Sequence, residues 1–166
     1  MAIETLKRTL LEETLAEHEI TLELLPDLPR PAGTSFEGRT LVETLPADLS
    51  AWVHQFAKTH SLPPSVIFLG AFQLLLQRYT GQDEVIVGMP VMGRPAQQFA
   101  NAVGYFINMI PLRAHCGGPV KLLDFLRKVH GTMLDGLYHS SYPFPLMLEK
   151  VEARQWDKNP IFPVTY

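Results

Sequence analysis

Two adjacent helices are the clearest feature of the apolar and polar pattern in the middle of the chain. From Pro46 onward, apolar residues recur at the spacing of one helix face, and they are Leu49, Trp52, Val53, Phe56 and Ala57. After a Pro63-Pro64 break, residues 65–79 are apolar on almost every side. We therefore predict an amphipathic helix that begins at Pro46, followed by a core helix that other elements cover on most sides.

Strand patterns and one further helix follow in the second half of the chain. β-Branched residues predict a strand over residues 84–89, and alternation predicts another over residues 106–110, ended by Pro111. A helix is expected from Pro119 to about Tyr138, with a buried stripe formed by Leu122, Leu126, Val129, Met133 and Leu137. A short helical turn after residues 142–145 and a strand-like run over 161–166 complete the pattern. The mixture predicts an α/β fold class, an α+β mixed sheet with helices packed on it.

The N-terminal part of the chain has weaker patterns. A helix is expected from about Ile3 to His18, since leucines and isoleucine recur there at near-helical spacing. Three prolines between Leu25 and Pro31 predict an extended connector, because proline interrupts both helices and central strands. Alternation from Arg39 to Leu45 predicts a short strand. Residues 1–30 are thus expected to form a helix and connector that precede the main body, residues 31–166.

Composition narrows the class of protein. The chain has 166 residues, a net charge of −3 and one cysteine, Cys116. The mild acidity argues against a nucleic-acid partner of the basic-patch kind, and a lone cysteine gives no sign of an oxidising compartment. The longest apolar stretch, Val66–Leu76, is shorter than the roughly 20 residues of a membrane span, and Met1–Glu19 has no signal-peptide core. We expect a cytoplasmic globular protein that binds neither membrane nor nucleic acid.

Motifs that would carry catalysis or metal binding are weak when taken from the residues alone. None of the six histidines has the spacing of a zinc site, so no metal is expected. His139 precedes two serines and His115 precedes Cys116, but neither pair comes with the third group that nucleophilic catalysis requires. The glycines form neither a phosphate loop nor a dinucleotide fingerprint. These residues are best interpreted as loop and packing positions.

Asn108 is the most informative single residue, because it is a polar amide inside an apolar strand candidate. Alternation places Asn108 on one face with Phe106 and Ile110, and Ile107 and Met109 on the other. A buried amide must be hydrogen-bonded or it costs about 1–3 kcal/mol. The residues alone favour an amide that braces a neighbouring loop over one that faces a channel.

The stretch around Asn108 resembles the fifth core motif of nonribosomal peptide synthetase condensation domains, [IV]-G-x-F-V-N-T-x-x-x-R. The matching positions are Val103, Gly104, Phe106, Asn108 and Arg113, while Ile107 replaces Val and Met109 departs from the usual Thr. Residues 139–145 are similar to the sixth motif, [HN]-Q-D-[YV]-P-F-E, through His139, Tyr142, Pro143 and Phe144. Residues 154–161 are similar to the seventh, R-D-x-S-R-N-P-L, through Arg154, Asn159 and Pro160.

The resemblance implies a fold and a reaction. Condensation domains have two chloramphenicol-acetyltransferase-like lobes, and they join a carrier-bound acyl or peptidyl thioester to a carrier-bound amine in a tunnel between the lobes. Their catalytic His-His-x-x-x-Asp-Gly motif lies in the N-terminal half, and no two histidines are adjacent in this chain. Residues 31–166 are therefore expected to be part of the C-terminal lobe, inactive alone and without catalytic residues. The expected partners are carrier proteins, which present a phosphopantetheine arm, and the missing N-terminal lobe; no cofactor is expected to bind directly.

The resemblance also assigns roles to residues. Gly104, Phe106 and Asn108 are expected on the tunnel side or at the lobe interface, and Met109 in place of Thr weakens any polar role there. Structural roles are expected for the other motif residues, which are Arg113, His139, Pro143, Phe144, Arg154, Asn159 and Pro160. Three alternatives stay open: a scaffold or interaction module without catalysis, an epimerisation, heterocyclisation or ester-forming variant of the same fold, and a small acyltransferase of the wider superfamily.

Overall fold

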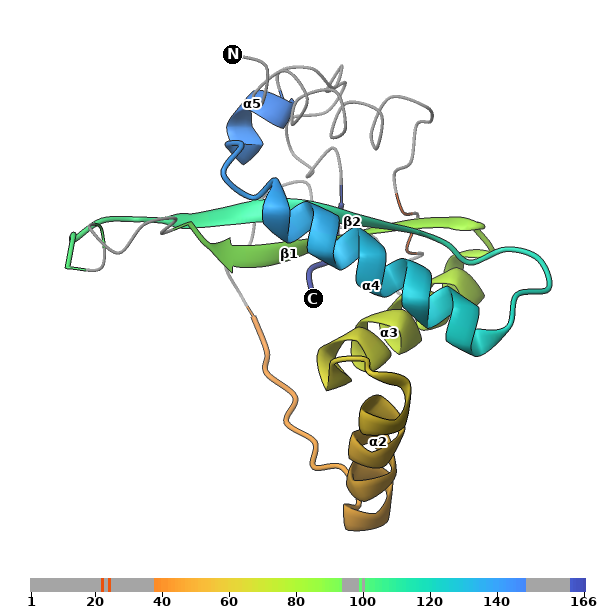
Figure 1. Ribbon diagram of the computed structural model, residues 1–166. Helices are drawn as coiled ribbons and strands as arrows, with labels where there is room; N and C mark the ends of the chain where they lie inside the picture. Colours follow the sequence, from red (N-terminus) through yellow and green to blue (C-terminus); the bar gives the residue numbers. More distant parts are fainter. Residues whose placement is uncertain (1–21, 23, 25–37, 94–98, 100, 149–161) are drawn as a thin grey trace.

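The computed structural model describes residues 22, 24, 38–93, 99, 101–148 and 162–166. Within them the elements follow in the order α2 (Ala47–His60), α3 (Pro64–Thr80), β1 (Glu84–Met92), β2 (Ile107–His115), α4 (Leu122–Tyr138) and α5 (Phe144–Leu148). The two strands form a long antiparallel ribbon, which α4 and α3 cross on one side while α2 extends away from it (Figure 1). The helix expected from Ile3 to His18 and the connector expected from Leu25 to Pro31 lie outside the described residues.

The second strand is longer than the sequence indicated, since β2 continues through Pro111 to His115. Pro111 lies opposite Gly88 in the register. The backbone N–H of Gly88 donates to Val164 O at 3.0 Å and its carbonyl accepts from Tyr166 N at 2.8 Å, so Gly88 points its backbone groups away from β2. Gly88 and Pro111 are therefore a pair without mutual hydrogen bonds. The missing N–H of Pro111 thus removes no hydrogen bond between β1 and β2. The expectation that Pro111 ends the strand was wrong for this reason.

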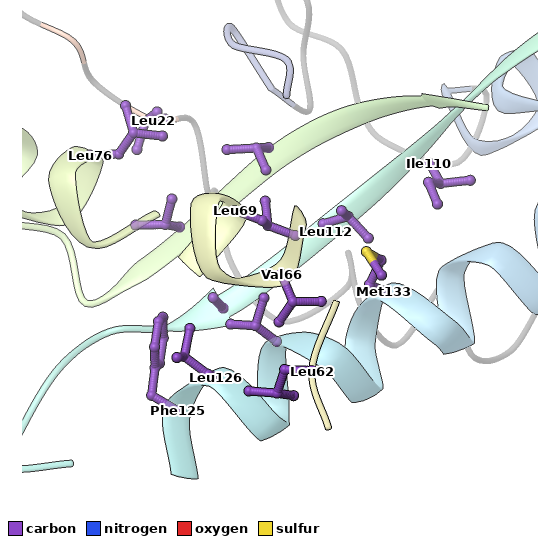
Figure 2. Packing of buried hydrophobic residues seen from close by; sticks show 14 residues of the cluster. Leu22, Leu62, Val66, Leu69, Leu76, Ile110, Leu112, Phe125, Leu126 and Met133 are labelled. Atoms are coloured by element: carbon purple, nitrogen blue, oxygen red, sulfur yellow. The ribbon is translucent and has the colours of Figure 1, made fainter. Parts of the chain in front are cut away.

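The main hydrophobic core lies between one face of the sheet and the helices α3 and α4. Val66 and Leu69 of α3, both fully buried, lie close to Leu112 of β2 and Leu126 of α4 (Figure 2). Gly70 permits the close approach of the two helices, because a Cβ there would lie 2.6 Å from a methyl group of Leu126. The predicted core helix is confirmed, although its outward side is exposed rather than covered.

The opposite face of the sheet carries a much smaller cluster. Its buried members are Ile86, Met147 of α5 and Phe162. The Phe162 ring lies against the backbone of Gly88, where a Cβ would come within 2.2 Å of it. Thr165 forms an isolated parallel bridge with Gly88, and the Tyr166 hydroxyl donates to Ser65 O at 2.8 Å. The strand-like character expected near the end of the chain is thus limited to one bridge in the described residues.

The amphipathic helix begins as predicted, with Pro46 as the residue before α2, but only part of its apolar face is buried. Val53 and Ala57 are buried, whereas Leu49 is exposed and Trp52 is 54% exposed. The α4 stripe differs in the same way, because Leu122 and Leu137 at its two ends are exposed. α4 also begins at Leu122 rather than Pro119, after an extended Lys121. Helical spacing identified the inward side, but the number of turns that are covered depends on the neighbouring elements.

One buried polar residue was not foreseen. Gln73 of α3 is only 1% exposed, and its Nε2 donates to Leu112 O at 3.2 Å across the main core. Nothing in the sequence paired Gln73 with Leu112, because the two residues are 39 positions apart along the chain. Its hydrogen bond to β2 became visible only when the helix and strand were placed side by side.

The strand expected from Arg39 to Leu45 is absent, and this prediction was wrong. Residues 39–45 have no regular secondary structure and are exposed throughout. Figure 1 draws them as an extended segment, in orange, that lies apart from the sheet and leads into α2. The alternation of apolar and polar residues indicated that this segment is able to form a strand. A strand also requires a neighbouring strand with free backbone groups.

No single helix in the described part of the chain is long and apolar enough to cross a membrane. The pair α2 and α3 reaches the required length and composition only together, and its two helices are bent by 108° at the break between them.

Candidate functional site

Asn108 joins two of the sequence motifs through hydrogen bonds to residues 32, 34 and 36 positions further along the chain. Its Nδ2 donates to Ser140 O at 2.8 Å and to Tyr142 O at 2.7 Å, and its Oδ1 accepts from the Phe144 backbone N–H at 3.0 Å. The amide thus uses both donors and one acceptor on the turn between α4 and α5. We call this arrangement the Asn108 clamp.

The turn held by the clamp leads the chain from one face of the sheet to the other. α4 packs its residues Leu126, Val129 and Met133 into the main core, whereas Met147 of α5 lies in the cluster on the opposite face. Between them, Tyr142 N donates to His139 O at 3.0 Å and Leu146 N to Pro143 O at 3.1 Å. The chain needs a fixed turn here because it must pass β2 within a few residues, and Asn108 of β2 provides the hydrogen bonds.

The clamp explains why a polar residue occupies an apolar strand. Asn108 shares the core-facing side of β2 with Ile110, as alternation predicted, while Met109 packs in the opposite cluster. An asparagine side chain offers two donors and two acceptor sites on a short arm, and three of these bind the turn. The bracing interpretation of Asn108 describes its contacts in this structure, and the proposed tunnel-side role remains a prediction.

Phe106 and Gly104 lie just before β2, at the end of the ribbon away from the main core. Phe106 is half-buried, and its carbonyl accepts from Gly93 N at 2.7 Å, which closes this end of the ribbon. A Cβ on Gly93 would lie only 2.1 Å from the same carbonyl oxygen, so this approach requires glycine. Gly104 is exposed between two exposed side chains, Val103 and Tyr105. The structure therefore brings Phe106 and Asn108 to the same end of the sheet, beside the α4–α5 turn.

A charged cluster lies at the other end of the ribbon. Arg113 Nε donates to Glu84 Oε2 at 2.8 Å, and His115 Nδ1 lies 2.7 Å from Glu84 Oε1. Burial of Glu84 opposes ionisation and would raise its pKa, but the hydrogen bonds from Arg113 and His115, with the charges of both, outweigh burial and hold the pKa below its ordinary value. Sequence reasoning missed Glu84 because only the register places it opposite His115.

Cys116 is a poor nucleophile in this setting. Burial, together with the nearby carboxylates of Glu84 and Asp83, raises the pKa of its thiol to about 11. A thiol with that pKa is protonated at neutral pH, whereas the thiolate is the reactive form. Within the described part of the chain, no three His, Cys, Asp or Glu side chains are grouped as metal ligands.

The remaining motif residues divide into those placed and those outside the described residues. His139 is buried where α4 ends, with its ring perpendicular to that of Tyr138, and its Nδ1 has no hydrogen-bond partner in the described part of the chain. Pro143 directly precedes α5, which begins at Phe144, and the centroid of the Phe144 ring lies 5.3 Å from that of the Phe162 ring. The predicted positions outside the described residues are Arg154, Asn159 and Pro160.

Comparison with known proteins identifies the family. The family model described as condensation domain matches residues 11–165, so the chain belongs to the condensation-domain family. The chain is 34% identical over 156 residues to polyketide synthase PksN of Bacillus subtilis (strain 168), and 31% identical over 150 residues to tyrocidine synthase 2 of Brevibacillus parabrevis. These alignments cover 93% and 90% of the chain but only 3% and 4% of the two relatives, respectively.

Solved structures support the fold. The chain resembles a four-domain nonribosomal peptide synthetase bound to AMP and glycine, with a TM-score of 0.82 and 24% identity over 94% of the chain and 12% of that structure. It also resembles the first condensation domain of the CDA synthetase, with a TM-score of 0.69 and 20% identity over 89% of the chain and 32% of that structure. The chain is thus a part of a condensation domain of the nonribosomal peptide synthetase type, with the chloramphenicol-acetyltransferase-like α/β fold.

Proposed function

We propose that this chain works as one lobe of a domain that forms amide bonds between two carrier-bound substrates. An amine on an acceptor carrier protein attacks the thioester of a donor carrier protein; the new C–N bond forms, the C–S bond breaks, and the donor thiol is released. The chain supplies one wall of the tunnel and a docking surface for the carriers. The phosphopantetheine arm of each carrier brings the reacting groups, and the paired catalytic histidines come from the other lobe.

The observation that carries this proposal is the meeting of two motif segments at the Asn108 clamp. Residues 103–113 and 139–145 match two separate condensation-domain motifs, and three hydrogen bonds from one side chain join them. A tunnel wall needs fixed backbone geometry, since small displacements of reacting groups lower rates steeply. The clamp supplies such rigidity at the end of the sheet where Phe106 and Gly104 lie.

The first test separates the lobe from the complete domain. Donor and acceptor carrier proteins, each loaded with its substrate, are mixed with this chain alone and with a domain completed by the N-terminal lobe, and amide product is measured by mass spectrometry. We expect product only with the completed domain. Turnover by this chain alone would contradict the assignment of the catalytic histidines to the other lobe.

The second test addresses the Asn108 clamp in the completed domain. Asn108→Ala removes all three hydrogen bonds, and we expect product formation to fall at least about tenfold, because a 1 Å displacement can cost on the order of 100-fold in rate. Asn101→Ala, the same substitution at an exposed position, is the matched control and should leave the rate unchanged. If Asn108→Ala lowered the melting temperature but kept full turnover, the clamp would have a structural role only.

A further inference from the structure

Residues 39–45 are extended and exposed, and they include the apolar residues Leu41, Val42 and Leu45. The side chains of Leu41 and Val42 are 84% and 81% exposed, although they are adjacent and must point to opposite sides of an extended chain. Among the described residues, no backbone hydrogen bond joins this segment to another part of the chain. Such a segment exposes apolar side chains to solvent, together with a row of backbone donors and acceptors. This is unusual in a folded domain.

The outward edges of the two strands that the structure describes are interrupted. The outward side of β1 is taken at Gly88 by Thr165, and two residues further Pro90 has no N–H to offer. On the outward side of β2, Pro111 interrupts the row of donors, and the turn between α4 and α5 lies beside Asn108. Prolines at outward positions are a common means of blocking strand addition. Residues 39–45 have no such protection, since they contain no proline.

We infer that residues 39–45 form a β-strand by pairing with a strand in the part of the condensation domain that lies outside these 166 residues. The inference rests on the proposal that the chain works as one part of such a domain. Its sheet has only two strands in the described residues and one isolated bridge, and two-stranded sheets have marginal stability alone. The CDA condensation domain is much longer than the region matched here, since the match covers 32% of it. The remaining polypeptide is large enough to supply the partner strand.

The partner is a strand with unpaired backbone groups and an apolar face. Leu41 and Leu45 share one side of the segment with Arg39 and Glu43, and Thr40, Val42 and Thr44 share the other. The side with Thr40, Val42 and Thr44 is β-branched throughout, whereas the other side alternates leucines with charged residues, which suits a strand that is covered on one face and partly open to solvent on the other. Pairing would satisfy the backbone groups and remove Leu41 and Val42 from water at the same time.

Residue-resolved hydrogen exchange tests the inference. Amide exchange at residues 40–45 is compared by NMR between this chain and the chain extended by the rest of the domain. In the extended protein we expect protection that alternates, strong at 40, 42 and 44 or at 41, 43 and 45, because one edge of a strand presents every second N–H. Protection on the order of 100-fold or more above that of this chain alone is expected at the paired positions, since core strands open far more rarely than exposed segments. The exposed residues Gly118, Val120 and Lys121, each of which has a backbone N–H, serve as the unchanged reference.

Proline substitutions give an independent measurement. Val42→Pro and Glu43→Pro remove neighbouring N–H groups that point in opposite directions, so only one of them should remove a ladder hydrogen bond. We expect one of the two to lower the melting temperature of the extended protein clearly more than the other, and neither to change that of this chain alone. Exchange at residues 40–45 that is equally fast in both proteins would overturn the inference. Protection that appears in this chain alone together with a dimer in sedimentation would overturn it in favour of pairing with a second copy.

These measurements use no substrate and no carrier protein. A domain that protects residues 39–45 but forms no amide would therefore refute the proposed reaction while leaving the pairing intact. A domain that forms the amide but leaves residues 39–45 unprotected would refute the pairing and leave the proposed reaction intact.

Discussion

The two faces of the β1–β2 sheet are built very differently. Among the described residues, the face toward α3 and α4 carries fourteen buried apolar residues in one continuous cluster, whereas the opposite face carries three, Ile86, Met147 and Phe162. On the second face, the charged cluster around Glu84 occupies the far end. Hydrophobic stabilisation follows the apolar area removed from water, so the first face provides most of the stability.

The second face and the Asn108 clamp fix the positions of particular backbone segments. Here single contacts hold particular backbone segments: Phe162 on Gly88, Asn108 on the α4–α5 turn, and Glu84 between two basic side chains. Loss of one such contact should displace a segment, whereas loss of a core side chain should lower the stability of the whole body. The predictions below measure this difference.

Leu69→Ala should have the largest effect. Leu69 is fully buried in the main core, and its truncation should lower the free energy of unfolding by about 2–5 kcal/mol through lost transfer energy and a new cavity. Leu75→Ala on the same helix, where the side chain is 51% exposed, is the matched control and should cost less than about 1 kcal/mol. Chemical denaturation measures both, and equal losses would mean that α3 is not packed as described.

Gly88→Ala should have an intermediate effect. A Cβ at this position would overlap the Phe162 ring, so the ring or the strand must move, at about 1–3 kcal/mol. Gly131→Ala on α4 meets no atom within 4 Å and should instead stabilise by about 0.5–1 kcal/mol through helix propensity. The Gly88→Ala cost should shrink when Phe162 is also replaced by Ala. An unchanged cost in that double variant would show that Phe162 is not the cause.

Glu84→Gln should have the smallest effect and a defined pH dependence. The pKa of Glu84 lies below its ordinary value in the folded protein, so its ionised form contributes stability at neutral pH, and this contribution is lost as pH falls through the folded pKa. Since the groups are partly exposed, the difference from the parent protein should stay below about 1 kcal/mol at neutral pH and decrease in acid. Asp124→Asn, which removes an exposed carboxylate that pairs with Arg127 in the first turn of α4, is the control for the loss of an exposed charge. A difference that grew on acidification would reverse the sign assigned to Glu84.

Much of the fold followed from the sequence because local patterns have local causes. The starts of α2, α3 and β1 lie at or within a residue of their predicted positions, since prolines and β-branched runs act over a few residues. The motif residues also led to the condensation-domain family that the family model matches. The two errors in the strands both concern backbone hydrogen bonds to a neighbouring strand. The end of β2 depended on whether the missing N–H of Pro111 was needed, and the strand at residues 39–45 depended on a partner.

The candidate site was predictable in its residues and not in its contacts. Asn108 stood out as an amide in an apolar strand, and the sequence favoured a bracing role, but nothing in the sequence paired it with Ser140, Tyr142 and Phe144. Glu84 had no distinguishing signal, because its two partners are 29 and 31 residues away along the chain and meet it only through the strand register.

The sequence by itself indicated where α2, α3 and β1 begin, which family the chain belongs to, and that Asn108 is a polar residue of interest, because propensity, periodicity and motif identity are properties of neighbouring residues. Only the tertiary structure decided which apolar sides are covered, which prolines a strand tolerates and where the Asn108 amide binds. Those outcomes depend on burial and on backbone groups from distant segments, which become neighbours only when the chain folds.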